Sequence, residues 1–139
     1  ACAAVDFSSN DFCEHLVSLL ACDPRHAREQ ANLVASLGEC WFCISAASEE
    51  LEVPLLGCGW RRAASVSRTL LELALSRFRE AGSIDCGEYA DALKDHGKVL
   101  NSYFGVESGN ESLEESVALH RRLFGEEHPR TLNAIRLRD

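Results

Sequence analysis

The stretch VALHRRLFGEEHPRTLNAI, residues 117–135, contains an abrupt break between two helical patterns. Apolar residues recur at helical spacing up to Phe124, as on one face of an α-helix. Gly125 follows, and glycine commonly ends a helix because it adopts a left-handed backbone without steric cost. Pro129 opens the second pattern, since a proline in the first helical turn loses no hydrogen bond. The stretch therefore predicts one helix that ends at Gly125 and another that runs from Pro129 to the terminus.

Similar start and stop signals divide the rest of the chain. Asp11 with Glu14 resembles a capping box, the pair Asp23-Pro24 opens a second helix, and Gly82 ends a third. No segment alternates polar and apolar residues with the period of two that marks a strand. The sequence predicts an all-α fold with about six helices, covering roughly residues 11–21, 24–45, 62–81, 89–103, 111–124 and 129–139.

Length, composition and charge narrow the class of protein. The chain has 139 residues, 46% of them apolar, which is typical of a single globular domain over residues 1–139. No apolar run approaches the roughly 18 residues that a membrane span requires. The net charge is −8, and an acidic surface repels phosphate backbones, so nucleic acid is not expected as a general partner.

The chain contains no methionine and begins at Ala1, so we expect a processed mature form, an excised domain or part of a longer chain. A processed organellar protein and a cytoplasmic one both remain open. Arginines cluster at residues 61, 62, 68, 77 and 79, either as a solvated face or as a contact patch for an acidic partner.

Small residues predict where helices pack closely. Gly38 lies three residues before Trp41, and Gly97 three before Leu100, so that a small and a large side chain alternate on one face. A close approach at a glycine calls for another small residue on the facing helix, and Ser116 lies 19 positions after Gly97. The residues expected to pack the helices together are Gly38, Trp41, Ala74, Gly97 and Ser116.

This spacing resembles that of tetratricopeptide repeats, which place the small residue of the first helix 19 positions before that of the second. The turn Phe124-Gly125-Glu126-Glu127-His128-Pro129 is similar to the Leu-Gly-x-x-His-Pro turn of the longer repeat variant in kinesin light chains. The resemblance is good across residues 86–135 and looser across 23–81, where an insertion breaks the spacing between Gly38 and Ala74. It implies a solenoid of stacked antiparallel helix hairpins, each contacting only its neighbours.

The insertion, residues 48–60, is predicted to be a long loop, and its apolar content is unusual. Loops longer than about 12 residues tend to be functional or disordered. These apolar side chains either fold over an edge of the core or dock on a partner or lipid surface. The candidate partner-binding residues are Val53, Leu55, Leu56, Trp60, Arg61 and Arg62.

Seven cysteines, an odd number, argue against a closed disulfide framework. Cys40 and Cys43 form a CxxC pair, but the pair lies inside a predicted helix and only single cysteines follow it, among them Cys58. Zinc sites need a second pair of ligands near the first. We expect buried, unreactive thiols, with a metal or disulfide site at Cys40, Cys43 and Cys58 as the alternative.

No catalytic constellation is present: the five histidines do not converge, and HExxH, Walker and GxSxG motifs do not occur. The sequence therefore favours a non-enzymatic adaptor or scaffold that binds another protein and needs no cofactor. A more specific form is a small accessory subunit of a larger complex, organellar or at the periphery of a membrane assembly. The alternative function is a metal- or redox-active thiol protein using the three cysteines named above.

Overall fold

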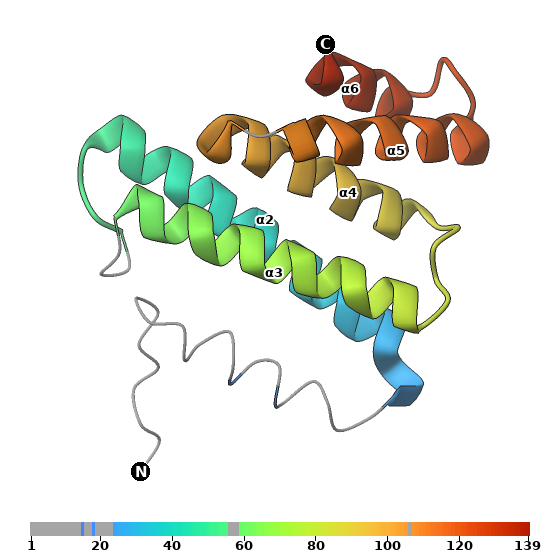
Figure 1. Cartoon of the computed structure of the whole chain (residues 1–139), viewed down its shortest axis with the longest axis horizontal. Helices are drawn as coiled ribbons and strands as arrows, with labels where there is room; N and C mark the ends of the chain where they lie inside the picture. Colours follow the sequence, from blue (N-terminus) through green and yellow to red (C-terminus); the bar gives the residue numbers. More distant parts are fainter. Residues whose placement is uncertain (1–14, 16–17, 19–23, 56–58, 106) are drawn as a thin grey trace.

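A computed structural model of the chain describes residues 15, 18, 24–55, 59–105 and 107–139. Within these ranges regular structure is entirely helical, which confirms the all-α prediction (Figure 1). After a 3-10 turn, Pro24–His26, the α-helices are α2 (Ala27–Leu51), α3 (Trp60–Glu80), α4 (Gly87–Val99), α5 (Glu107–Phe124) and α6 (Pro129–Arg138). A π-helical stretch, Leu100–Phe104, extends α4. Most of the helix predicted over residues 11–21 lies outside the described residues.

The helices α2 and α3 form the first hairpin and lie side by side in Figure 1. Their close approach is centred on Gly38, where an added Cβ would lie 2.8 Å from Cγ of Leu71. At the same level the hydroxyl of Ser67 donates to the carbonyl oxygen of Gly38 over 2.6 Å. The helices can touch here because the first helix has no side chain at this position. Ala74, another residue predicted to pack the helices together, is fully buried in the core, but the atoms that the structure places nearest to Gly38 belong to Leu71.

The helices α4 and α5 form the second hairpin. A Cβ added at Gly97 would lie 2.6 Å from Cγ of Leu113 and 2.7 Å from the backbone oxygen of Gly109. Ser116 instead faces Ala90, to whose carbonyl oxygen its hydroxyl donates over 2.8 Å. Both predicted residues lie in the interface, but seven positions along α4 separate Gly97 from Ala90, or roughly 10 Å of helix. The prediction that Gly97 faces Ser116 was therefore wrong. Gly97 faces Gly109 and Leu113, whereas Ser116 faces Ala90, about two helical turns away along α4.

One core joins the two hairpins. Trp41 belongs to it, as predicted, and is 4% exposed. The remaining fully buried members include Val34, Leu70, Leu71, Phe78, Ala90, Leu93 and Val99.

The connection between α2 and α3 is shorter than the predicted loop over residues 48–60. Ser48 ends up buried near the end of α2, where its hydroxyl donates to the carbonyl oxygen of Val53 over 2.6 Å. Glu52 adopts a left-handed backbone with φ 56° and ends the helix, and α3 begins at Trp60. The loop prediction was therefore too long at both ends, because α2 continues to Leu51 and Trp60 is already the first residue of α3. Leu56 and Cys58 lie outside the described residues.

The turn that suggested the fold is confirmed. Gly125 has φ 91° and follows the last residue of α5, and Pro129 is the first residue of α6. His128 caps α6, since its Nδ1 accepts a hydrogen bond from the backbone N–H of Arg130 over 3.2 Å. The Thr131 hydroxyl donates to the carbonyl oxygen of Gly125 over 2.8 Å, which holds the turn closed. A membrane span would need a longer apolar helix than any that the described residues form.

Candidate functional site

The helices α2, α4 and α6, which are not consecutive in the chain, together line one hollow of about 250 Å³. We call this hollow the α2/α4 groove. Its lining residues are Asn32, Ala35, Ser36, Glu39, Glu88, Asp91, Ala92, Asp95 and Arg130. Four of the nine are carboxylates, so the groove is polar and predominantly acidic.

Helical spacing explains why these side chains share one groove. On α4, Glu88, Asp91 and Asp95 are separated by three and four positions, so they lie along one face. Asn32, Ser36 and Glu39 repeat this arrangement on α2. Ala35 and Ala92 are small, which lets the two helices approach. Sequence reasoning missed the groove because it followed the apolar stripe of α4 and assigned acidic residues to solvent; the spacing of these three acids was the available signal.

Asp95 is the unusual member of the groove, because this carboxylate is only 6% exposed. Its Oδ1 accepts no hydrogen bond from the part of the chain that the structure describes. The ammonium groups of Lys98 and Lys94 lie 3.6 Å and 4.0 Å from Oδ1, close enough for electrostatic attraction but beyond hydrogen-bond distance. Burial raises the pKa of Asp95 to about 6, even though both lysines oppose the shift.

The neighbouring carboxylates are partnered within the chain. Arg28 donates to Glu88 over 3.2 Å. Burial alone would raise the pKa of Asp91, but the hydrogen bond from His120 and the charges of Lys94 and Arg130 outweigh it and lower that pKa. Asp91 and Asp95 are therefore one helical turn apart with pKa values shifted in opposite directions.

Behind the groove, Ser116, His120 and Asp91 form a hydrogen-bonded chain that sequence reasoning also missed. Nε2 of His120 lies 3.1 Å from Oδ1 of Asp91, and its Nδ1 lies 2.9 Å from the backbone oxygen of Ser116. Nδ1 of His120 also lies 3.1 Å from the Ser116 hydroxyl, so the fully buried ring has polar partners on both of its nitrogens. The Ser116 hydroxyl is fully buried, and its proton is donated to the carbonyl oxygen of Ala90. A nucleophilic hydroxyl must instead be reachable by a substrate and give its proton to a base. The chain holds α4 to α5.

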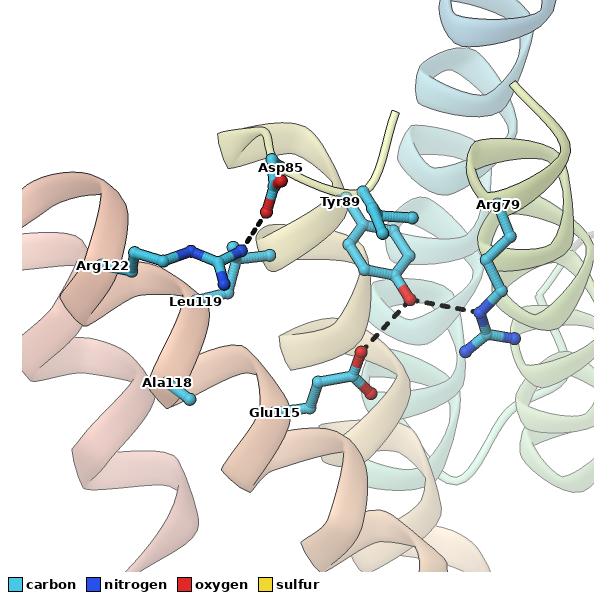
Figure 2. A pocket seen from close by; sticks show the side chains of 8 residues that line it. Arg79, Asp85, Tyr89, Glu115, Ala118, Leu119 and Arg122 are labelled. Atoms are coloured by element: carbon cyan, nitrogen blue, oxygen red, sulfur yellow. Dashed lines mark hydrogen bonds and ion pairs between the residues drawn. The ribbon is translucent and has the colours of Figure 1, made fainter. Parts of the chain in front are cut away.

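A larger hollow of about 450 Å³ lies between the end of α3, the start of α4 and α5. Figure 2 shows the Tyr89 hydroxyl between Arg79 and Glu115: Nε of Arg79 donates to it over 3.2 Å, and it donates to Oε1 of Glu115 over 3.3 Å. Arg122 forms an ion pair with Asp85 across the opening. The polar groups drawn here satisfy one another, in contrast to Asp95 in the smaller groove.

The predicted partner-binding residues are only partly brought together. Trp60 and Arg61 line a third hollow, of about 320 Å³, with Tyr103 and Phe104 from the π-helical stretch. The Trp60 and Tyr103 rings lie 5.5 Å apart, and Arg61 lies over the Trp60 ring.

Three other members of that predicted set do not line this hollow, and Leu56 is outside the described residues. Val53 is exposed, whereas Leu55 and Arg62 are half-buried, and none of the three is among its lining residues. Whether these side chains bind a partner together stays a prediction.

The cysteines also differ from expectation. Cys40 and Cys43 are exposed, free thiols on α2, so the prediction that they are buried was wrong. Trp41, which lies between them in the sequence, is by contrast buried. Among the described residues no three His, Cys, Asp or Glu side chains form a cluster suited to a metal ion. The alternative site at Cys40, Cys43 and Cys58 stays a prediction, since Cys58 lies outside those residues.

Comparisons with protein-family models, with curated proteins and with solved structures find no match for this chain. The resemblance to tetratricopeptide repeats therefore stays a prediction. The function has to follow from the geometry of the α2/α4 groove itself.

Proposed function

We propose that this chain is a non-enzymatic helical adaptor that binds a segment of another protein in the α2/α4 groove. The observation that carries the proposal is the joint construction of the groove by α2, α4 and α6. Helices packed on a common core offer a pre-formed surface, so a bound segment needs little rearrangement of the adaptor. Stacked hairpins with this groove on their first helices are the arrangement that a repeat-type adaptor uses.

The groove suits this role better than the hollows at Tyr89 and at Trp60. The larger hollow at Tyr89 has its polar groups paired internally, so a ligand there would have to break existing bonds. The hollow at Trp60 is already bordered by rings in contact with one another. The α2/α4 groove instead contains the carboxylate of Asp95, whose Oδ1 accepts no hydrogen bond from the described residues. Membership of a larger complex, as an accessory subunit, is the setting in which such binding would operate.

Site-resolved photo-crosslinking tests the proposal. Benzoylphenylalanine replaces Ser36, an exposed residue in the groove, and in a matched variant it replaces Thr69, an exposed residue of α3. Both hydroxyls donate to the carbonyl oxygen four residues earlier, so the two positions are chemically equivalent.

In a lysate of the cells that make the protein, we expect a discrete crosslinked polypeptide from position 36 that excess unlabelled chain suppresses. Crosslinking of equal yield from position 69, or none from position 36, would contradict binding in the groove.

A further inference from the structure

We propose that the polypeptide bound in the α2/α4 groove presents an arginine or lysine side chain whose cationic head lies against Asp95. The inference rests on the proposed function and specifies the chemistry of the partner. It starts from Asp95, a carboxylate of the groove whose buried Oδ1 accepts no hydrogen bond from the described residues. A buried carboxylate is costly unless a donor satisfies it.

The charge of the groove favours a cation. Its lining includes the carboxylates of Glu39, Glu88, Asp91 and Asp95 but only one cationic side chain, Arg130. Arg130 is directed to Asp91, whose Oδ2 lies 3.6 Å from its Nη2. A cation entering near Asp95 would meet carboxylates of both α2 and α4, which is electrostatically favourable in a partly desolvated site.

The lysines beside Asp95 do not substitute for such a donor. Nζ of Lys98 lies 4.6 Å above the Phe42 ring, a cation–π contact that it would weaken by moving toward Asp95. Lys94 lies 3.8 Å from Oδ1 of Asp91 as well as 4.0 Å from Asp95, so its charge is shared between the two. Both lysines lower the cost of the buried carboxylate without completing its hydrogen bonds.

The chain's own N-terminal segment does not carry the required group. Residues 1–23 contain no arginine and no lysine. We therefore assign the cation to a separate polypeptide rather than to this segment. Arginine suits the site especially well, because a guanidinium has five donors in a planar fork and can bond to more than one carboxylate at once.

Two synthetic 12-residue peptides of alanine, glycine and serine test the proposal, one with three arginines and the other with citrulline at the same three positions. Citrulline keeps the shape of arginine but carries no charge. Binding is followed from amide chemical shifts of the isotope-labelled full chain at physiological ionic strength, where long-range attraction between exposed charges is screened.

We expect the arginine peptide to change the chemical shifts of amides around Asn32, Glu39 and Asp95. The citrulline peptide should bind at least about tenfold more weakly, because it cannot form the charge-assisted hydrogen bond. Asp95→Asn should lower the affinity for the arginine peptide by a similar factor, and Glu39→Gln should lower it by less. Glu50→Gln is the matched control, because Glu50 is exposed on the same helix as Glu39, outside the groove, and the substitution removes one negative charge.

Equal affinity for the two peptides, shifts outside the groove, or an equal effect of Asp95→Asn and Glu50→Gln would overturn the inference. These outcomes leave the adaptor proposal separately testable. If position 36 gives crosslinks but the chain binds both peptides equally, groove binding is supported and recognition of a cation is rejected. If crosslinking fails but the arginine peptide binds at Asp95, recognition of a cation is supported and the adaptor proposal is rejected.

Discussion

Gly97 and Gly109 face each other across the second hairpin, so closely that a Cβ on either would lie within 3.0 Å of the other's backbone oxygen. Gly38 and Leu71 mark a similar approach in the first hairpin, but there the nearest atom to an added Cβ belongs to a side chain. The two hairpins therefore depend on their glycines to different degrees, because a side chain can yield where a backbone cannot.

Gly97→Ala should lower the free energy of unfolding by about 2 kcal/mol or more, as overpacking against a fixed backbone does. Gly38→Ala should change it by about 1 kcal/mol or less, since Leu71 can adjust and alanine improves helix propensity by about 1 kcal/mol. Both residues lie inside helices, so the propensity gain is common to the two variants. Urea denaturation followed by circular dichroism gives the comparison. A greater loss from Gly38→Ala would show that the backbone contact at Gly109 is not limiting.

The contrast between the hairpins shows which parts of the fold can be predicted from patterns in the sequence. The break at Gly125 and Pro129 was predictable because both residues act locally, through a positive φ and a missing N–H. The partner of Gly97 was not, because it depends on where α5 begins after Gly105, and one residue of offset changes the facing side chain. Spacing to Ser116 gave the right helix and the wrong level.

The groove was harder to predict than the fold. Asp95 is acidic and lies in a charged segment, Lys94-Asp95-His96, for which solvent exposure is the ordinary expectation. Its burial arises from contact between α2 and α4, a tertiary relationship that the periodicity of either helix alone does not contain. The exposure of Cys40 and Cys43 is likewise set by how α2 packs: Trp41 is directed into the core, and the two cysteine positions are left exposed.

Thiol reactivity should follow that geometry. Cys40 and Cys43 are exposed, whereas Cys86 is half-buried, its thiol donates to the carbonyl oxygen of Ser83 over 3.3 Å, and burial raises its pKa. Because the thiolate is the reactive form, Cys86 should react with iodoacetamide at least about tenfold more slowly than the two α2 cysteines at pH 7.5. Peptide mass spectrometry of timed samples measures each site. Comparable rates at Cys86 and Cys40 would contradict the described burial.

Replacing Asp95 should stabilise the protein at neutral pH. Its folded-state pKa of about 6 lies above the ordinary value of about 3.9, so the folded state binds the extra proton. The stability associated with this group is present below pH about 4 and is lost as the pH rises through 6. Asp95→Asn removes the buried charge and should raise the free energy of unfolding by about 2 kcal/mol at pH 8, with almost no effect near pH 4.

The measurement for Asp95 is urea denaturation of both proteins across this pH range, with Glu50→Gln as a control for the change in net charge. Stabilisation by Asp95→Asn combined with weaker binding of the arginine peptide is what a residue retained for binding should show. A difference between Asp95→Asn and the parent chain that does not vary with pH would mean that the carboxylate is better solvated than its 6% exposure implies.

Asp91, one turn away, should respond in the opposite direction. Its pKa is lowered in the folded state, so the stability it provides is present above pH about 4 and is lost as the pH falls through the folded-state value. Asp91→Asn removes the carboxylate that Nε2 of the buried His120 contacts over 3.1 Å, and it should cost about 1–2 kcal/mol at pH 7, discounted for the 30% exposure of the Asp91 side chain. The cost should shrink on acidification below pH 4, because the parent carboxylate is then protonated as well.

Asp85→Asn is the matched control for that loss, because Asp85 forms its ion pair with Arg122 at the surface and its removal should change stability by less than about 0.5 kcal/mol. Denaturation of the three proteins at pH 7 and pH 3.5 completes the comparison. If Asp91→Asn and Asp95→Asn shifted stability in the same direction at pH 7, the assignment of one carboxylate to holding α4 against α5 and the other to the groove would fail. If Asp91→Asn lowers the free energy of unfolding and Asp95→Asn raises it, then Asp91 stabilises the fold, whereas Asp95 is retained at a cost in stability, as expected of a residue that binds a partner.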